Sequence, residues 1–199
     1  MNNQKLAQKA LKAGVDFVEI DVSKRLIFNK FTAQHNGLMG IVGWGRMLET
    51  ILTAEVKTRA FLDLKPISYR ATFAARFIEL LLKLGIKNAK ICGHNWEMIS
   101  QLAQKNNAKP YYTIKDDDGL QKFKRAMSRL AKPAGLSVKH NLIDKKFMEF
   151  VGNLPAGRQV WAWTVNDLVE VKRLADLKVD GIITDKWEQL STLNQKLQT

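Results

Sequence analysis

The sequence has little cysteine and little proline, with one cysteine, Cys92, and four prolines among 199 residues. A single thiol excludes an internal disulfide framework and fits a reducing compartment. No proline-rich linker, internal repeat or shift in composition divides the chain. Because 46% of the residues are hydrophobic, the chain is long enough to form one sizeable core. We therefore expect a single domain over residues 1–199.

Long apolar runs are also missing. The stretch FIELLLKLGI is interrupted by charged residues and is far too short to span a bilayer. The opening residues, MNNQKLAQKALKAG, carry Lys5, Lys9 and Lys12 at intervals, so they do not show the apolar centre and cleavage site of an export signal. These absences predict a soluble, cytoplasmic protein.

Acidic residues are the minority charge, with 19 Asp and Glu against 32 Lys and Arg, a formal net charge of +13. Such a charge attracts anionic ligands, which include nucleic acid, phospholipid head groups and phosphate esters. The basic run KFKRAMSRLAK has helical spacing, which is typical of a solvated helix face. No base-reading motif is recognisable. We therefore expect no specific nucleic-acid partner and at most peripheral membrane contact, and we rank a basic nucleic-acid binder last.

Short β-rich runs alternate with amphipathic stretches, which predicts an α/β fold with a parallel sheet. The predicted strands are 16–22, 60–64, 88–93, 108–114, 135–138, 158–164 and 180–183. The predicted helices are 3–13, 46–57, 69–84, 96–106, 118–131, 144–152, 167–177 and 187–197. Residues 25–37 form an extended excursion. A closed (β/α)₈ barrel needs eight strands and about 250 residues, so the sheet is either open or a barrel without its first strand.

Three acidic residues come from neighbouring predicted strands, and the functional groups of parallel α/β folds gather at the carboxyl ends of such strands. Glu19 and Asp21 share one face of the strand DFVEIDV because successive side chains alternate. With Asp63, they would supply oxygen ligands to Mg²⁺ or Ca²⁺. Lys65 shares a face with Asp63 and would balance the acids or hold a phosphate oxygen. Solvated or mutually paired surface charges are the alternative interpretation.

The three histidines of the chain, His35, His94 and His140, all fall at or just beyond a predicted strand end or extended segment. His35 has the pKa range of a proton donor or acceptor near neutrality. Trp161 and Trp163 share a strand face, for which packing is the ordinary explanation. The other polar residues at strand ends are Thr164, Asn166, Thr184 and Asp185.

Together and in this order, these motifs resemble the glycerophosphodiester phosphodiesterase family over nearly the whole chain. AGVDFVEIDVS matches its metal-binding strand, FTAQHNG its catalytic-histidine segment and FLDLK its acid-x-Lys motif, while VWAWTVND and VDGIITD match its last two strand motifs. The resemblance implies His35 and Lys65 as catalytic residues. It implies a metal site formed by Glu19, Asp21 and Asp63. It also implies substrate contacts at Lys65, His94, Trp163 and Asn166.

The resemblance also implies a (β/α)₈ barrel of the TIM type whose first strand is missing here, leaving about seven β/α units. In the family that strand ends in a His-Arg pair, the histidine being the partner acid/base and the arginine a phosphate clamp. This sequence contains no such pair at its start. The implied activity is metal-dependent hydrolysis of glycerophosphodiesters to an alcohol and glycerol 3-phosphate in phospholipid metabolism, with Mg²⁺ or Ca²⁺ as cofactor.

Two further interpretations stay open. Without the His-Arg pair, the chain would be a catalytically impaired barrel that binds a metal ion or an anionic head group, unless His94 or His140 replaces the lost histidine. The second is a sphingomyelinase D-like phospholipase. Asp63 stands where the family more often has Glu, and Asp at this position is also typical of those phospholipases. The head group and the oligomeric state are left open by the sequence.

Overall fold

The computed structural model describes residues 2–24, 30–34, 46–65, 71–155 and 158–190. These residues form one nine-stranded sheet in the order β3-β2-β1-β4-β5-β6-β7-β8-β9. The strands are β1 (Val18–Lys24), β2 (Phe31–Ala33), β3 (Arg46–Met47), β4 (Ala60–Leu64), β5 (Lys90–Gly93), β6 (Lys109–Ile114), β7 (Gly135–Lys139), β8 (Gln159–Trp163) and β9 (Gly181–Ile182). β1 and β4 to β9 run parallel, while β2 and β3 add an antiparallel extension beside β1. The predicted α/β class with seven parallel strands is confirmed.

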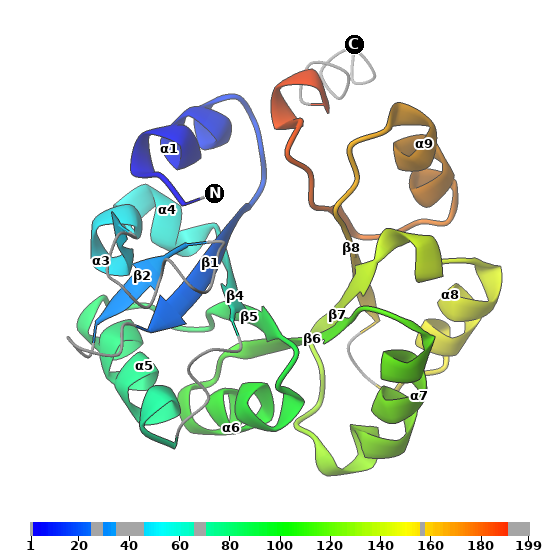
Figure 1. The fold of residues 1–199 in the computed structure, drawn as a ribbon, viewed down its shortest axis with the longest axis horizontal. Coiled ribbons are helices and arrows are strands. Elements are labelled where there is room, and N and C mark those ends of the chain that lie inside the picture. Colours follow the sequence, from blue (N-terminus) through cyan, green and yellow to red (C-terminus); the bar gives the residue numbers. More distant parts are fainter. Residues whose placement is uncertain (1, 25–29, 35–45, 66–70, 156–157, 191–199) are drawn as a thin grey trace.

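The sheet curls around a central axis with the helices outside it (Figure 1). The helices are α1 (Gln4–Lys12), α3 (Leu48–Ile51), α4 (Ala54–Thr58), α5 (Ala71–Lys83), α6 (Trp96–Asn106), α7 (Asp117–Ala126), α8 (Lys145–Gly152) and α9 (Leu168–Asp176), with the 3₁₀ turns η2 (Met127–Arg129) and η3 (His140–Leu142). Within the described ranges, no pairing joins β9 to β1, so the sheet is a TIM-barrel-like ring that is not closed. No helix in this part of the chain is both long and apolar enough to cross a membrane.

The two faces of the sheet carry different side chains. Ile20, Leu62 and Ile91 are at most 1% exposed and pack in the main core between the sheet and the helices. A separate cluster inside the ring contains Phe61, Cys92, Tyr111 and Trp161. Phe61 and Trp161 stack with ring centroids 4.8 Å apart and an interplanar angle of 5°. This aromatic layer forms a floor inside the ring.

Two glycines make room for that floor. A Cβ atom on Gly135 would lie 2.6 Å from the Tyr111 ring, and one on Gly181 would lie 2.8 Å from the Trp161 ring. Both distances are below van der Waals contact. The bulky rings therefore fit inside the ring of strands because the neighbouring strands present no side chain at these points.

The predicted helix over 46–57 is wrong. Arg46–Met47 forms β3, and the remainder is split into α3 and α4. Between them Leu52 has φ −75° and ψ 59°, and the Thr53 backbone N–H donates to the Ile51 carbonyl at 2.8 Å, which makes an inverse γ-turn. The turn lets Ile51, Leu52 and Val56 all reach the core.

Other boundaries follow the sequence closely. β4 and α6 match the predicted ranges, and Asp167 caps α9 by accepting a hydrogen bond from the Val169 N–H at 2.8 Å. The helix predicted over 118–131 ends at Ala126 and continues only as η2. In the predicted excursion, β2 pairs antiparallel with β1, which confirms its extended character there. Most of the helix predicted over 187–197 lies outside the described residues.

Candidate active site

Three carboxylates meet inside the ring on the neighbouring strands β1 and β4. The parallel register sets Asp21 opposite Asp63, and Glu19 lies two residues earlier on the same face of β1. One ligand oxygen from each of the three carboxylates lies within 4.8 Å of the others. Asp21 is only 3% exposed, whereas Glu19 and Asp63 are partly buried. The structure therefore brings together the three acids that the sequence selected.

Lys65 lies directly on this carboxylate cluster. Its backbone N–H donates to the Val22 carbonyl at 3.0 Å and extends the β1–β4 ladder by one residue. Its Nζ is 2.5 Å from Asp21 Oδ1 and also pairs with Asp63 Oδ2. Burial by itself would lower the pKa of the Lys65 ammonium, but Asp63 and Asp21 outweigh burial and raise the pKa above its ordinary value. Lys65 is therefore a fixed cation.

One cation does not balance the whole cluster. Burial, and then the charge of Asp21, raise the pKa of Glu19 to about 8. Carboxylate oxygens are the ligands that Mg²⁺ and Ca²⁺ prefer, and a divalent ion would replace the proton that Glu19 otherwise keeps. The donor set of Glu19, Asp21 and Asp63 thus fits a hard divalent cation.

Asn2 is a site residue that the sequence did not reveal. Its Nδ2 donates to Asp21 Oδ2 at 2.9 Å, and its Oδ1 accepts a hydrogen bond from the Asp21 backbone N–H at 3.1 Å. Asp21 is therefore held by Asn2 on one carboxylate oxygen and by Lys65 on the other. The two residues are 19 positions apart, and an asparagine before a helix is ordinarily interpreted as a cap.

A cavity of about 420 Å³ opens beside the carboxylate cluster. Glu19, Asp21, Asp63 and Lys65 line it from β1 and β4, and Thr113, Ser137, Trp161 and Trp163 line it from β6, β7 and β8. The Thr113 Oγ1 and the indole nitrogens of Trp161 and Trp163 are buried and make no hydrogen bond in the structure. Buried polar atoms are ordinarily paired, so these atoms are candidates to bind polar groups of a ligand. Strand alternation predicts that Thr113 points inward, but not that its hydroxyl is unpaired.

The three histidines differ in position. His35 lies outside the described residues, and its catalytic role stays a prediction. His94 follows β5 and lines the cavity, and partial burial lowers the pKa of its imidazole. His140 Nδ1 is 2.6 Å from Glu170 Oε1 on α9, and His140 does not line the cavity. Of the two possible substitutes for a missing histidine, only His94 is therefore near the carboxylates.

The predicted substrate-contacting residues Trp163 and Asn166 differ in whether they line the cavity. Trp163 lines the cavity together with Thr164, Thr184 and Asp185. Asn166 does not line it. Its Oδ1 accepts from the Thr184 hydroxyl and the Asp185 N–H, both at 3.0 Å, and its Nδ2 donates to Asp185 Oδ2 at 3.0 Å. Asn166 thus fixes the loop that carries two of the lining residues.

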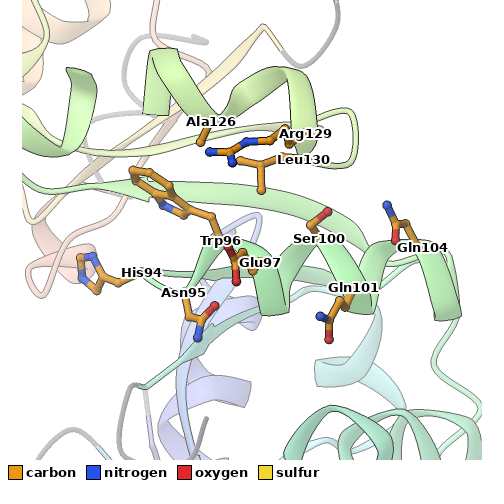
Figure 2. A pocket seen from close by; sticks show the side chains of 10 residues that line it. All are labelled: His94, Asn95, Trp96, Glu97, Ser100, Gln101, Gln104, Ala126, Arg129 and Leu130. Atoms are coloured by element: carbon orange, nitrogen blue, oxygen red, sulfur yellow. The ribbon is translucent and has the colours of Figure 1, made fainter. Parts of the chain in front are cut away.

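A larger groove of about 620 Å³ lies between α6 and the α7–η2 segment (Figure 2). It is lined by Glu97, Gln101, Gln104 and Arg129, and it shares only His94 with the first cavity. Trp96 is turned inward at this groove, because its indole N–H donates to the Thr113 carbonyl at 3.0 Å. The groove contains none of the clustered carboxylates, so the smaller cavity is the better candidate for chemistry.

Comparison with solved structures supports the same fold. A glycerophosphodiester phosphodiesterase from Thermotoga maritima matches with a TM-score of 0.74 and 20% identity, over 96% of this chain and 91% of that one. One from Parabacteroides distasonis matches with a TM-score of 0.74 and 17% identity, over 100% and 91%. A phosphodiesterase from Oleispira antarctica, solved with the product sn-glycerol-3-phosphate, matches with a TM-score of 0.66 and 14% identity, over 98% and 89%.

At such low identity, these structures establish similarity of fold. A search of curated proteins gave no match. The model of the glycerophosphoryl diester phosphodiesterase family matches residues 63–189, which is more than half of the chain and includes Asp63, Lys65 and the last two strand motifs. The chain therefore belongs to the glycerophosphoryl diester phosphodiesterase family.

Proposed function

We propose that this chain hydrolyses glycerophosphodiesters to an alcohol and glycerol 3-phosphate, as part of phospholipid metabolism in the cytoplasm. The observation that carries the proposal is the cluster of Glu19, Asp21 and Asp63, whose ligand oxygens lie within 4.8 Å of one another beside Lys65. Family membership and the product complex of the Oleispira antarctica enzyme point to the same substrate class.

The carboxylate cluster would hold Mg²⁺ or Ca²⁺, which when bound supplies positive charge to neutralise the phosphodiester. Lys65 stays protonated because of its raised pKa and offers its ammonium to a phosphate oxygen that enters the cavity. On the opposite wall, the unpaired hydroxyl of Thr113 and the indole N–H of Trp163 would orient the rest of the substrate.

Proton transfer requires a donor for the leaving alkoxide and an acceptor for the attacking oxygen. We assign one of these roles to His35, which lies outside the described residues. His94 at the rim of the cavity is the described residue that fits the other role, and its lowered pKa keeps the imidazole neutral near pH 7. Asn166 acts indirectly, through the loop that holds Thr184 and Asp185.

The test is hydrolysis of glycerophosphocholine by the purified chain with Mg²⁺, with Ca²⁺ and with a chelator. A version extended upstream by a strand ending in His-Arg is assayed in parallel. Asp63→Asn should lower the rate by roughly 10²-fold or more, because an uncharged amide binds a hard cation poorly. Asp118→Asn is the control, since Asp118 is exposed, pairs with Lys122 at 2.5 Å and does not line the cavity. Absence of ion-dependent hydrolysis by both versions contradicts the proposal.

A second candidate function is ion or head-group binding without turnover. It is favoured by the unjoined strands β1 and β9, where the described residues provide no His-Arg pair beside the carboxylates. In that case Mg²⁺ or Ca²⁺ would raise the unfolding temperature of the chain, yet neither version would release an alcohol. Turnover by the chain itself excludes this second function.

A further inference from the structure

The excess positive charge of the protein is unevenly distributed between the two ends of the ring of strands. The connections from each helix to the following strand lie at the amino end of the sheet, opposite the carboxylate cluster. Six of these connections have an exposed basic side chain within them or at the helix or strand residue next to them: Lys12, Lys87, Lys109, Lys132, Arg158 and Lys178. The acidic residues among the same connections are Asp16, Asp176 and Asp180. The exposed basic residues that these connections contribute therefore outnumber the acidic ones by two to one.

The carboxyl end differs. Its exposed lysines at positions 115, 145, 146 and 186 each lie within two residues of an acid, in Asp116, Asp144 and Asp185, whereas exposed Lys30 and Arg46 beside the β2–β3 extension have no such neighbour. Asp167 adds a further negative charge after β8. Among the described residues, the carboxyl end therefore carries exposed charges of both signs, whereas the exposed charges of the amino end are mostly basic.

The shape and composition of the basic face indicate its partner. The six basic residues belong to different β/α units, and these units follow one another around the ring of strands (Figure 1). A bilayer presents anionic groups over an area wider than the ring of strands, whereas a duplex presents them along a narrow strip. Five of the six are lysines, which act as point charges and lack the planar fork with which arginine reads bases and clamps phosphates. Of the exposed large hydrophobic residues in the described ranges, none is aromatic, so stacking on unpaired bases has no platform there.

We infer that the amino-end face, defined by these six basic residues, adsorbs the protein to the surface of an anionic phospholipid bilayer. Adsorption on this face turns the cavity beside Glu19, Asp21 and Asp63 away from the bilayer and toward solution. The protein then receives a water-soluble diester rather than an intact lipid of the membrane that holds it, a consequence that rests on the proposed function.

The test is sedimentation with phosphatidylcholine vesicles, with and without a third of phosphatidylglycerol. The wild-type chain should bind only the anionic vesicles, and binding should disappear near 1 M salt, where the Debye length is about 3 Å. The triple variant Lys87→Gln, Lys109→Gln, Lys132→Gln should bind roughly a hundredfold more weakly, at about fivefold per lysine. The matched control changes Lys145, Lys146 and Lys186 at the carboxyl end to Gln and should bind within a few-fold of wild type.

Equal loss of binding in the two triple variants, or no binding of wild type to anionic vesicles, overturns the inference. Duplex and single-stranded DNA are titrated at the same salt, and tighter binding to DNA than to the vesicles also overturns it. Hydrolysis of glycerophosphocholine is measured in the presence of the vesicles as a separate readout. Adsorption without hydrolysis supports the inferred membrane surface and contradicts the proposed function. Hydrolysis without adsorption supports the proposed function and contradicts the inferred surface.

Discussion

Asp21 is the most constrained carboxylate of the site. Lys65 and Asn2 each bind one of its oxygens, and Asn2 also accepts a hydrogen bond from its backbone N–H. Residues that hold a metal ligand in place in this way ordinarily change ion affinity 10- to 100-fold when they are lost. At the scale of single residues, Asn2 is therefore a positioning residue for the proposed ion site.

Replacing Asn2 by Ala should weaken Mg²⁺ or Ca²⁺ binding by roughly 10- to 100-fold, because the Asp21 carboxylate loses the hydrogen bond from Asn2 that helps to orient it. The matched control is Asn3→Ala. Asn3 caps α1 by accepting from the Lys5 N–H at 2.9 Å, and its loss should cost about 1 kcal/mol of stability without changing ion affinity. Affinity is obtained from the rise in unfolding temperature with ion concentration. Equal affinities of the two variants would contradict the role of Asn2.

Glu19 should make the ion-free protein less stable as the pH rises. Its pKa of about 8 in the folded state lies above the value of about 4.3 expected when unfolded. The folded state therefore keeps a proton that the unfolded state releases, so this stabilisation is complete below the unfolded pKa and is lost as the pH rises through about 8. Urea unfolding in chelator between pH 5 and 8 measures it. Glu19→Gln should flatten the profile, and an unchanged slope would disprove the assignment.

At the scale of elements, α9 is tied to the segment that follows β7 by a charged cluster. Glu170 accepts hydrogen bonds from Arg173, and His140 Nδ1 lies 2.6 Å from Glu170 Oε1. Arg173 also donates to the carbonyls of Ile143 and His140, at 2.6 and 3.0 Å. One guanidinium thus connects α9 with η3, and Glu170 holds that guanidinium in place.

Glu170→Gln should lower the free energy of unfolding by about 1–2 kcal/mol near neutrality, because charge-assisted hydrogen bonds are lost. The hydrogen bond from Arg173 comes first among the causes that lower the pKa of Glu170 to about 2. A lowered carboxylate pKa stabilises the fold above the unfolded pKa, and the gain is lost as the pH falls through about 2. The difference between wild type and variant, measured by urea unfolding, should therefore shrink from pH 6 to pH 3. Glu149→Gln, on the exposed side of α8, should show no such trend.

The sequence predicts helices and strands better than it predicts which side chains contact each other. β4 and α6 are found at their predicted bounds because period-two and helical patterns are local properties. The break at Leu52 could not be predicted in this way. Ile51 and Val56 are both buried on either side of it, so the spacing of apolar residues still looks like that of one continuous helix. The pairing of Asp21 with Asp63 follows from strand order, but the hold of Asn2 on Asp21 depends on where α1 docks, which no local pattern encodes.

At the scale of the whole molecule, the strands differ in how they are supported. β6 and β7 pair along both edges, whereas β9 pairs only with β8 within the described residues. Hydrogen exchange should therefore be slowest for peptides that cover β6 and β7 and fastest, among the parallel strands, for β9. Mass spectrometry of peptic fragments gives this order directly. Protection of β9 equal to that of β6 would show that the end of the sheet is covered in solution.

The lone thiol lies inside the ring. Cys92 is 2% exposed, packs with Phe61, Tyr111 and Trp161, and has a pKa well above its ordinary value because of burial and the nearby charge of Asp63. Cys92 also lines the cavity beside the carboxylates, and a thiol this buried and this weakly ionised reacts slowly with an aromatic disulfide reagent until the side chains around it move apart. Its rate of covalent labelling therefore reports how often the cavity opens as far as the thiol, and an ion bound between Asp21 and Asp63 should slow that rate by fixing β1 against β4.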